Sequence, residues 1–204
     1  ALLPDADRAN QEIRDYCREN KLNLIYEGTM RATAGFLKMA REFKEAGYEI
    51  DLELMSVPKL ESYPSTFLRY AMQLISNSEP RWVPKSVRDA SYDNFLVTLK
   101  EFEKEGLFDH ATVYKRGDDK PEPFYSTEGR EFQKPSEAVL YGREMFNEDL
   151  IRKFPMKYEM IYTVFSESAP TLMSYVGELF EMYEMEKNGN KIEENKKEGE
   201  DRDD

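Results

Sequence analysis

The sequence predicts an α/β protein with a parallel sheet flanked by helices, followed by a helical C-terminal region. Two short apolar runs, Leu22–Tyr26 and Ile50–Met55, enclose a segment with helical spacing at residues 33–46. Strand, helix and strand with short connections form a βαβ unit, which implies parallel pairing and a right-handed crossover. After Ser126 strand patterns give way to helical ones. These observations predict the fold class.

Apolar spacing, glycine and proline place the remaining elements. In chain order we expect a helix over Asp5–Asn20, a strand over Leu22–Tyr26, a helix over 33–46 ended by Gly47, a strand over Ile50–Met55, a helix over Leu60–Ile75, a loop from Ser76 to Pro84, a helix over Ser86–Glu105 ended by Gly106, a strand over Ala111–Tyr114, and helices over 136–186 interrupted at Pro155 and Pro170. Glycine directly after the last helical turn is typical of a helix C-terminus.

The amino-acid composition disfavours several classes of ligand and site. The 204 residues carry 41 acidic and 29 basic side chains, a formal net charge of -12. Such a chain repels nucleic acid and anionic membranes, although local arginines can still bind phosphate. The single cysteine, Cys17, cannot form an internal disulfide, and the single histidine, His110, disfavours a histidine-based metal site. With no apolar stretch long enough for a bilayer, we expect a cytoplasmic protein.

The first candidate site is the run from Asn23 to Arg31. Glu27, Thr29 and Arg31 place a carboxylate, a hydroxyl and a cation within five positions at the end of a predicted strand. The carboxyl ends of strands line the ligand crevice of α/β proteins, so this trio suits a phosphorylated or sugar-bearing ligand. Glu27 could also approach a magnesium ion through water. The alternative is a strand followed by a solvated turn.

Two more arginines extend this site. Arg69 lies on the predicted helix after the second strand, and Arg81 lies in the following loop, which Trp82 and two prolines would stiffen. Together with Arg31 they could hold phosphate oxygens through paired hydrogen bonds. The alternative for each is a surface arginine.

A nucleotide-binding motif is missing from the sequence. No glycine is followed by lysine anywhere, so the G-x-x-x-x-G-K-[ST] phosphate loop is absent. No metal-ligand set is evident either, and the metal site stays unknown.

Short runs over residues 23–126 carry a family resemblance. They are Asn23–Arg31, Lys44–Glu49, Val57–Tyr63 with Thr66–Tyr70, Arg81–Lys85, and Gly106–Phe108 with Val113–Arg116. In this order and at this spacing, they resemble the zeta toxin family, P-loop kinases of bacterial toxin–antitoxin systems.

The resemblance implies a P-loop kinase-like fold and ATP-dependent phosphorylation of a hydroxyl on UDP-N-acetylglucosamine, with ATP and Mg²⁺ as cofactors and an antitoxin as a further partner. It assigns Glu27, Thr29 and Arg31 to the substrate and Arg69 and Arg81 to catalysis at the nucleotide phosphates. The family's phosphate loop and general base precede the matching segment, and Gln11 stands where the family has glutamate. We therefore expect a kinase domain incomplete at its N-terminus, from either a partial sequence or a degenerate relative.

We therefore predict that the chain has three parts: a partial zeta-toxin-like kinase domain at 1–130, a helical extension at 131–187 and a disordered acidic tail at 188–204. Two other functions stay open. The chain could be a non-catalytic module that retains the sugar-nucleotide site, or a helical interaction protein whose functional part is residues 136–186.

Overall fold

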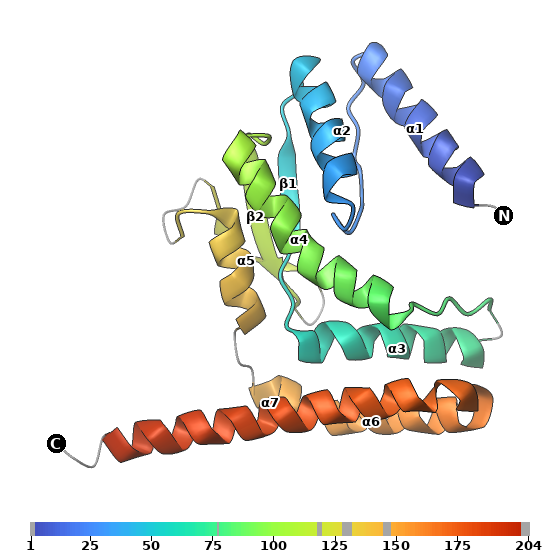
Figure 1. The fold of residues 1–204 in the computed structure, drawn as a ribbon, viewed down its shortest axis with the longest axis vertical. Coiled ribbons are helices and arrows are strands. Elements are labelled where there is room, and N and C mark those ends of the chain that lie inside the picture. The colour runs from blue at the N-terminus through green and yellow to red at the C-terminus, as the bar shows by residue number, and fades with distance from the viewer. Residues whose placement is uncertain (1–2, 77, 118–119, 128–131, 145–147, 201–204) are drawn as a thin grey trace. The chain divides into compact units, whose positions relative to one another are not determined.

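A computed structural model describes the backbone of residues 3–76, 78–117, 120–127, 132–144 and 148–200. Side chains at positions 3, 4, 148, 149 and 189–200 lie outside this description. The chain forms two compact units. Unit 1 comprises residues 1–55 and 89–140, and unit 2 comprises residues 56–88 and 141–204. The predicted α/β class and the helical C-terminal region are both confirmed (Figure 1), whereas the predicted boundaries at residues 130 and 187 remain predictions.

The sheet belongs to unit 1. Its strands are β1 (Asp51–Met55), β2 (His110–Lys115) and β3 (Glu122–Ser126), in the order β1-β2-β3. β1 and β2 pair in parallel with Asp51 opposite His110, whereas β2 and β3 pair antiparallel with an irregularity between Val113 and Tyr114. The first two strands confirm the prediction, while β3 was not predicted. The sheet is therefore mixed rather than wholly parallel.

Helices of unit 1 build its core around this sheet. They are α1 (Leu3–Glu19), α2 (Thr33–Glu45), α4 (Lys85–Glu105) and α5 (Pro135–Glu144), of which the first turn of α4 and the last turn of α5 belong to unit 2. Gly47 and Gly106 have φ angles of +81° and +64°, which fits their predicted places after α2 and α4. The core combines apolar side chains of α2, α4 and α5 with those of the strands: Leu37, Ala40, Leu54, Leu99, Phe102, Ala111, Val113, Tyr125, Ala138 and Val139.

The strand predicted over Leu22–Tyr26 does not form. These residues have no regular secondary structure, and the Ile25 side chain is 98% exposed. A strand requires a neighbour for its backbone hydrogen bonds, and among the described residues the three strands pair only with one another. The predicted βαβ unit is therefore wrong. The parallel pair is instead β1 with β2, which α3 (Lys59–Ile75) and α4 separate in the sequence.

Unit 2 is a helical bundle. Helix α3 packs against α6 (Glu148–Ser168), and α6 packs against α7 (Met173–Glu200), with a short 3₁₀ turn over Pro170–Leu172 between them. The interruption predicted at Pro170 is thus confirmed. The one predicted at Pro155 is wrong, because α6 continues through it. Proline removes one helical hydrogen bond, and buried neighbours on the same helix, Phe154 and Ile161, offset that loss.

The predicted acidic tail falls partly outside the description. Helix α7 continues to Glu200, while the side chains from residue 189 and all of residues 201–204 are not described. Disorder of this tail stays a prediction. Within the described part of the chain, no helix is long and apolar enough to cross a membrane.

Candidate functional site

The turn from Glu27 to Arg31 is shaped by one unusual residue. Met30 has a φ of +53°, in the left-handed region that few residues other than glycine adopt, and its side chain is buried in the core of unit 1. Burial of the thioether fixes this conformation. Because backbone strain of this kind concentrates at functional sites, it supports a functional role for the turn.

Helix α4 anchors the turn by hydrogen bonds. The Thr98 hydroxyl donates to the Met30 carbonyl at 2.7 Å, and Asn94 Nδ2 donates to the Arg31 carbonyl at 3.1 Å. Thr33, the first residue of α2, lies 2.7 Å from Thr98 through the two hydroxyl oxygens. Thr98 is fully buried. The turn is consequently held by its backbone, while its other side chains stay available.

Those side chains are the predicted substrate residues. Glu27, Thr29 and Arg31 are all exposed, and they lie on one turn of unit 1. The glycine among them allows close packing, since a Cβ on Gly28 would lie 2.7 Å from Cζ of Phe36 unless that ring moved. The three polar groups thus share one turn anchored to α4, but this turn does not end a strand as predicted, and their role as substrate residues stays a prediction.

A groove of about 410 Å³ lies beside this turn, between α1 and α2. Its walls include Gln11 and Arg14 from α1, Phe36 and Met39 from α2, and Tyr26, the residue before Glu27. The Tyr26 and Phe36 rings meet edge to face with their centroids 5.8 Å apart. Sequence reasoning did not find this groove, although Gln11 was singled out through the family resemblance.

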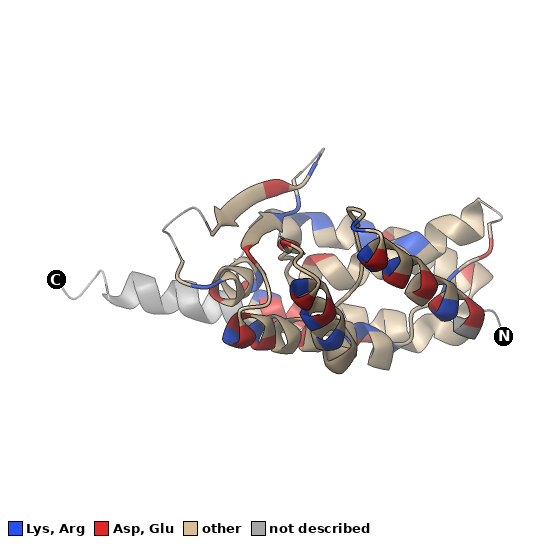
Figure 2. Cartoon of the chain, turned by 90° about the horizontal axis from the view of Figure 1, so that it is seen from above, with Lys and Arg blue, Asp and Glu red and all other residues tan. Residues whose placement is uncertain are grey.

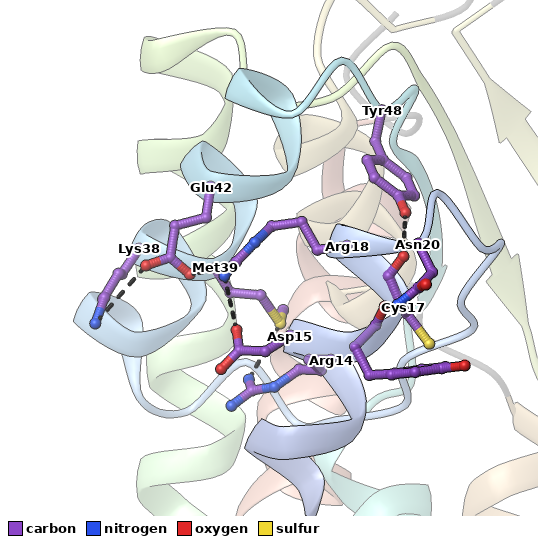
Figure 3. A network of polar contacts seen from close by, with 10 residues as sticks. Arg14, Asp15, Cys17, Arg18, Asn20, Lys38, Met39, Glu42 and Tyr48 are labelled. Carbon is purple, nitrogen blue, oxygen red and sulfur yellow. Dashed lines mark hydrogen bonds and ion pairs between the residues drawn. The ribbon is translucent and has the colours of Figure 1, made fainter.

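One arginine of the groove differs from its neighbours. Arg14 donates to the Met39 sulfur at 3.3 Å (Figure 3), and its guanidinium lies 5.3 Å from the centre of the Tyr26 ring. Within the described residues it has no carboxylate partner. Arg18, by contrast, forms ion pairs with Asp15 at 2.9 Å and Glu42 at 3.1 Å. Arg14 is thus the cation that the groove offers to an anionic group.

Contacts between α1 and α2 fix the groove walls. Besides the Arg18–Glu42 pair, the hydroxyl of Tyr48, which follows α2, shares its one proton between the Cys17 carbonyl at 2.7 Å and the Leu22 carbonyl at 3.1 Å. Basic and acidic residues alternate along α1 (Figure 2). The spacing of Arg14 and Arg18, four residues apart on one helix face, is the sequence signal that could have indicated the groove.

Arg69 and Arg81, the predicted catalytic residues, lie in unit 2. Both side chains are exposed, Arg69 on α3 and Arg81 in the loop that follows it. The Arg81 backbone N–H donates to Gln73 Oε1 at 3.0 Å, and the Gln73 carbonyl accepts from the Ser78 N–H at 3.1 Å. The last turn of α3 therefore holds the loop.

The residues needed for a complete nucleotide and metal site are not all found. The sequence lacks the glycine-lysine phosphate loop. Among the described residues, no group of three or more His, Cys, Asp or Glu side chains could hold a metal ion. What this chain does provide is a polar turn anchored to α4, two exposed arginines at the predicted catalytic positions, and a groove with three cationic side chains. Of these three, Arg18 and Lys38 pair with carboxylates, whereas Arg14 has no carboxylate partner among the described residues.

Comparison with known proteins identifies relatives of this chain. The family model described as Zeta toxin matches residues 2–142. "Toxin zeta" of Enterococcus hirae is 32% identical over 116 residues, which cover 56% of this chain and 41% of that protein. "Toxin PezT" of Streptococcus pneumoniae is 30% identical over 97 residues, 47% of this chain and 38% of that protein. The matches thus span well under half of the relatives' length.

A solved structure is similar in fold. It comes from work on the PezAT chromosomal toxin–antitoxin system of the human pathogen Streptococcus pneumoniae. The similarity has a TM-score of 0.61 at 18% sequence identity and covers 76% of this chain and 62% of that one. At this identity, the similarity concerns the fold alone.

Proposed function

The chain belongs to the zeta toxin family, and from this premise we propose that it contributes the substrate side and the arginine side of a kinase that phosphorylates a hydroxyl of UDP-N-acetylglucosamine. One observation carries the proposal: the exposed Glu27, Thr29 and Arg31 lie on a turn fixed by the buried Met30 and by Thr98. Recognition of a sugar requires hydrogen-bonding groups on a rigid support.

The substrate half of the proposal rests on complementary chemistry. Glu27 accepts hydrogen bonds from sugar hydroxyl or amide groups, Thr29 donates or accepts, and Arg31 supplies positive charge. The neighbouring groove adds Arg14 for a phosphate and the Tyr26 ring for a planar or apolar surface. A sugar nucleotide combines all of these features in one molecule.

The arginine half assigns Arg69 and Arg81 to the transferring phosphate. Guanidinium groups stabilise charge on a phosphoryl group in the transition state, and replacing such a group lowers kcat more than it raises KM. Arg81→Lys should recover only part of the loss, because lysine lacks the planar two-pronged contact. If Arg69→Ala and Arg81→Ala both kept normal kcat in an active kinase, this half would be wrong.

ATP and Mg²⁺ are the cofactors that the family implies. The residues of this chain do not fit a complete site for them, because the phosphate loop is missing from the sequence and the described residues form no metal-ligating cluster. The 204 residues alone should accordingly show no kinase activity, and ATP-dependent phosphorylation of UDP-N-acetylglucosamine by them would contradict this expectation.

The proposal is tested by calorimetry with UDP-N-acetylglucosamine. Glu27→Ala should weaken binding by about 1–3 kcal/mol, the cost of a lost hydrogen bond to a charged group. Glu49→Ala, which removes an exposed carboxylate elsewhere in unit 1, is the matched control and should change nothing. Equal affinities of the wild-type chain and Glu27→Ala would remove the substrate assignment.

A second candidate is a non-catalytic sugar-nucleotide-binding protein, because the exposed Glu27, Thr29 and Arg31 could bind such a ligand without any phosphoryl transfer. Binding of UDP-N-acetylglucosamine without turnover, even after a phosphate loop has been supplied at the N-terminus, would distinguish it from the kinase. An antitoxin partner is a further proposal. It rests on the relation to toxins of toxin–antitoxin systems, and co-purification of a partner with the tagged chain from its own cells tests it.

A further inference from the structure

The loop that carries Arg81 is held in place by an aromatic cluster. Trp82, the only tryptophan of the chain, directly follows Arg81 and is half-buried. Its ring centroid lies 5.4 Å from Phe67 and 5.5 Å from Tyr70, both on α3. Both pairs meet edge to face, the arrangement that aromatic quadrupoles favour. The loop is thus held at Trp82 by ring packing, as well as at Arg81 by the hydrogen bond to Gln73.

The outer walls of this cluster come from the C-terminal helices. Phe165 of α6 lies 6.1 Å from Trp82 and is fully buried, and Tyr175 of α7 lies 5.4 Å from Trp82 and is half-buried. Phe165 also contacts Phe67 and Tyr70, at 5.8 Å and 5.4 Å. All five rings belong to unit 2.

These walls lie outside the family match, which ends at residue 142. Helix α3 and the Arg81 loop fall inside it. A region that the family model does not cover therefore completes the support of a loop that it does cover.

We propose that α6 and α7 act as a buttress that fixes the Arg81 loop through Trp82, with Phe165 and Tyr175 as positioning residues for Arg81. The consequence for catalysis rests on the proposed function, which supplies the role of Arg81. The physical reason is entropic. An exposed arginine on an unsupported loop samples many positions, and ordering it at the phosphate would then cost binding energy.

Alternative tasks for the rings are less consistent with the geometry. A core role alone would not require Trp82, because Phe67 and Phe165 already contact each other. Trp82 adds a contact that only the loop can provide. The inward-facing indole and the exposed Arg81 alternate along the loop, so holding the one limits the motion of the other.

The test uses the 204-residue chain and Trp82 as an internal probe. Time-resolved fluorescence anisotropy measures the local motion of the indole, and hydrogen exchange measures protection of the Arg81 amide. In Tyr175→Ala, the amplitude of fast indole motion should at least double and Arg81 amide protection should fall by roughly tenfold. Tyr175→Phe keeps the ring and should restore wild-type values for both.

Phe180→Ala is the matched control. Phe180 is also an aromatic residue of α7, but its ring contacts Tyr158 and Tyr183. This variant should leave the Trp82 signal unchanged even where it lowers the melting temperature. Phe165→Ala should loosen Trp82 more than Tyr175→Ala does. If Phe165→Ala fails to fold, the motion of Trp82 in Tyr175→Ala still tests the proposal, because Tyr175 is only half-buried.

Unchanged indole motion in Tyr175→Ala would overturn the buttress, as would equal loosening in Phe180→Ala. Neither measurement depends on substrate or turnover. If the chain fails to bind UDP-N-acetylglucosamine, the proposed function fails while the anisotropy result stands. If the sugar nucleotide binds but indole motion is unchanged in Tyr175→Ala, the buttress proposal is wrong and the proposed function still holds.

Discussion

The Glu27–Arg31 turn in unit 1 and the Arg81 loop in unit 2 are stabilised in different ways. Hydrogen bonds from Asn94 and Thr98 to two consecutive carbonyl groups hold the turn. Ring packing around Trp82 and one hydrogen bond from the Arg81 amide hold the loop. Both segments present exposed charged side chains.

This difference matters for what each segment can do. Directional hydrogen bonds fix individual backbone atoms, so the side chains of the turn start from defined positions, as discrimination between sugar hydroxyls requires. Aromatic packing fixes the place of the loop and depends less on direction. The long side chain of Arg81 covers the remaining distance, and its planar group then makes the two-pronged contact with phosphate oxygens. Because their supports are different residues, we expect that a substitution can disrupt one segment without changing the other.

The largest effect is expected from removing the ring that supports the loop. Trp82→Ala should lower the free energy of unfolding by about 3 kcal/mol, the low end of the range for large-to-small aromatic substitutions because Trp82 is only half-buried. Urea denaturation followed by far-UV circular dichroism measures this loss. Tyr162→Ala, at a ring of α6 that is 49% exposed, should cost less than about 1 kcal/mol. Similar losses in the two variants would show that Trp82 is not an anchor.

A somewhat smaller effect should follow from removing the anchor of the turn. Thr98→Val keeps the shape of a fully buried side chain but leaves the Met30 carbonyl without its donor. We expect a loss of about 2 kcal/mol, the cost of an unsatisfied buried acceptor. Thr163→Val on the exposed side of α6 is the control and should change stability by no more than about 0.5 kcal/mol. A neutral Thr98→Val would mean that Met30 keeps its conformation without help.

The two segments also differ in what the sequence could reveal. Periodicity predicted α2, β1, α3, α4 and β2 because each buries one apolar face, a local property. Glu27, Thr29 and Arg31 were found for a similar reason, since they are neighbours in sequence. The strand at residues 22–26 was predicted wrongly because strand formation depends on a partner elsewhere in the chain.

The groove and the ring cluster could not be predicted for a related reason. Arg18 and Glu42 pair across 24 positions, and Trp82 meets α6 and α7 only after the bundle of unit 2 has formed. The type of a residue says little about which residues it will contact. The sequence indicated that Trp82 stiffens a loop, but its partners depend on how helices far apart in sequence pack.

A further prediction concerns how the stability of unit 1 changes at acidic pH. Asp109 accepts from Lys44 Nζ at 2.7 Å and from the Ile50 N–H at 2.7 Å, beside the start of β1. The Lys44 ammonium, and then the Ile50 N–H, hold the pKa of this carboxyl below its usual value. A lowered pKa in the folded state adds stability at pH values above the unfolded pKa of about 3.9. That stability is lost as the pH falls through the folded pKa.

Asp109→Asn should therefore cost about 1 kcal/mol at pH 7, a modest value because the pair is partly exposed. The difference from wild type should shrink as the pH falls below the unfolded pKa and through the lowered folded pKa, because wild-type Asp109 is then protonated as well. Thermal melts of both chains between pH 2.5 and 7 measure this. A difference that stayed constant with pH would show that the charge of Asp109 contributes nothing.

The smallest effects test how tightly the turn packs on the groove. Gly35, within the first turn of α2, has space for a methyl group, since its Cβ would come no closer than 4.0 Å to Ala32. Gly35→Ala should stabilise the chain by about 0.5 kcal/mol through reduced backbone freedom. Gly28→Ala should gain nothing, because its Cβ would lie 2.7 Å from Cζ of Phe36 and the ring must move. The φ of Gly28 is not in the left-handed region, so the difference between the two variants reports this contact rather than backbone strain.

Melting temperatures give the stabilities, and the NMR shifts of the Phe36 ring protons should change in Gly28→Ala. Equal stabilisation of both variants, with unchanged Phe36 shifts, would mean that the turn packs loosely on α2 and that alanine is tolerated beside Glu27.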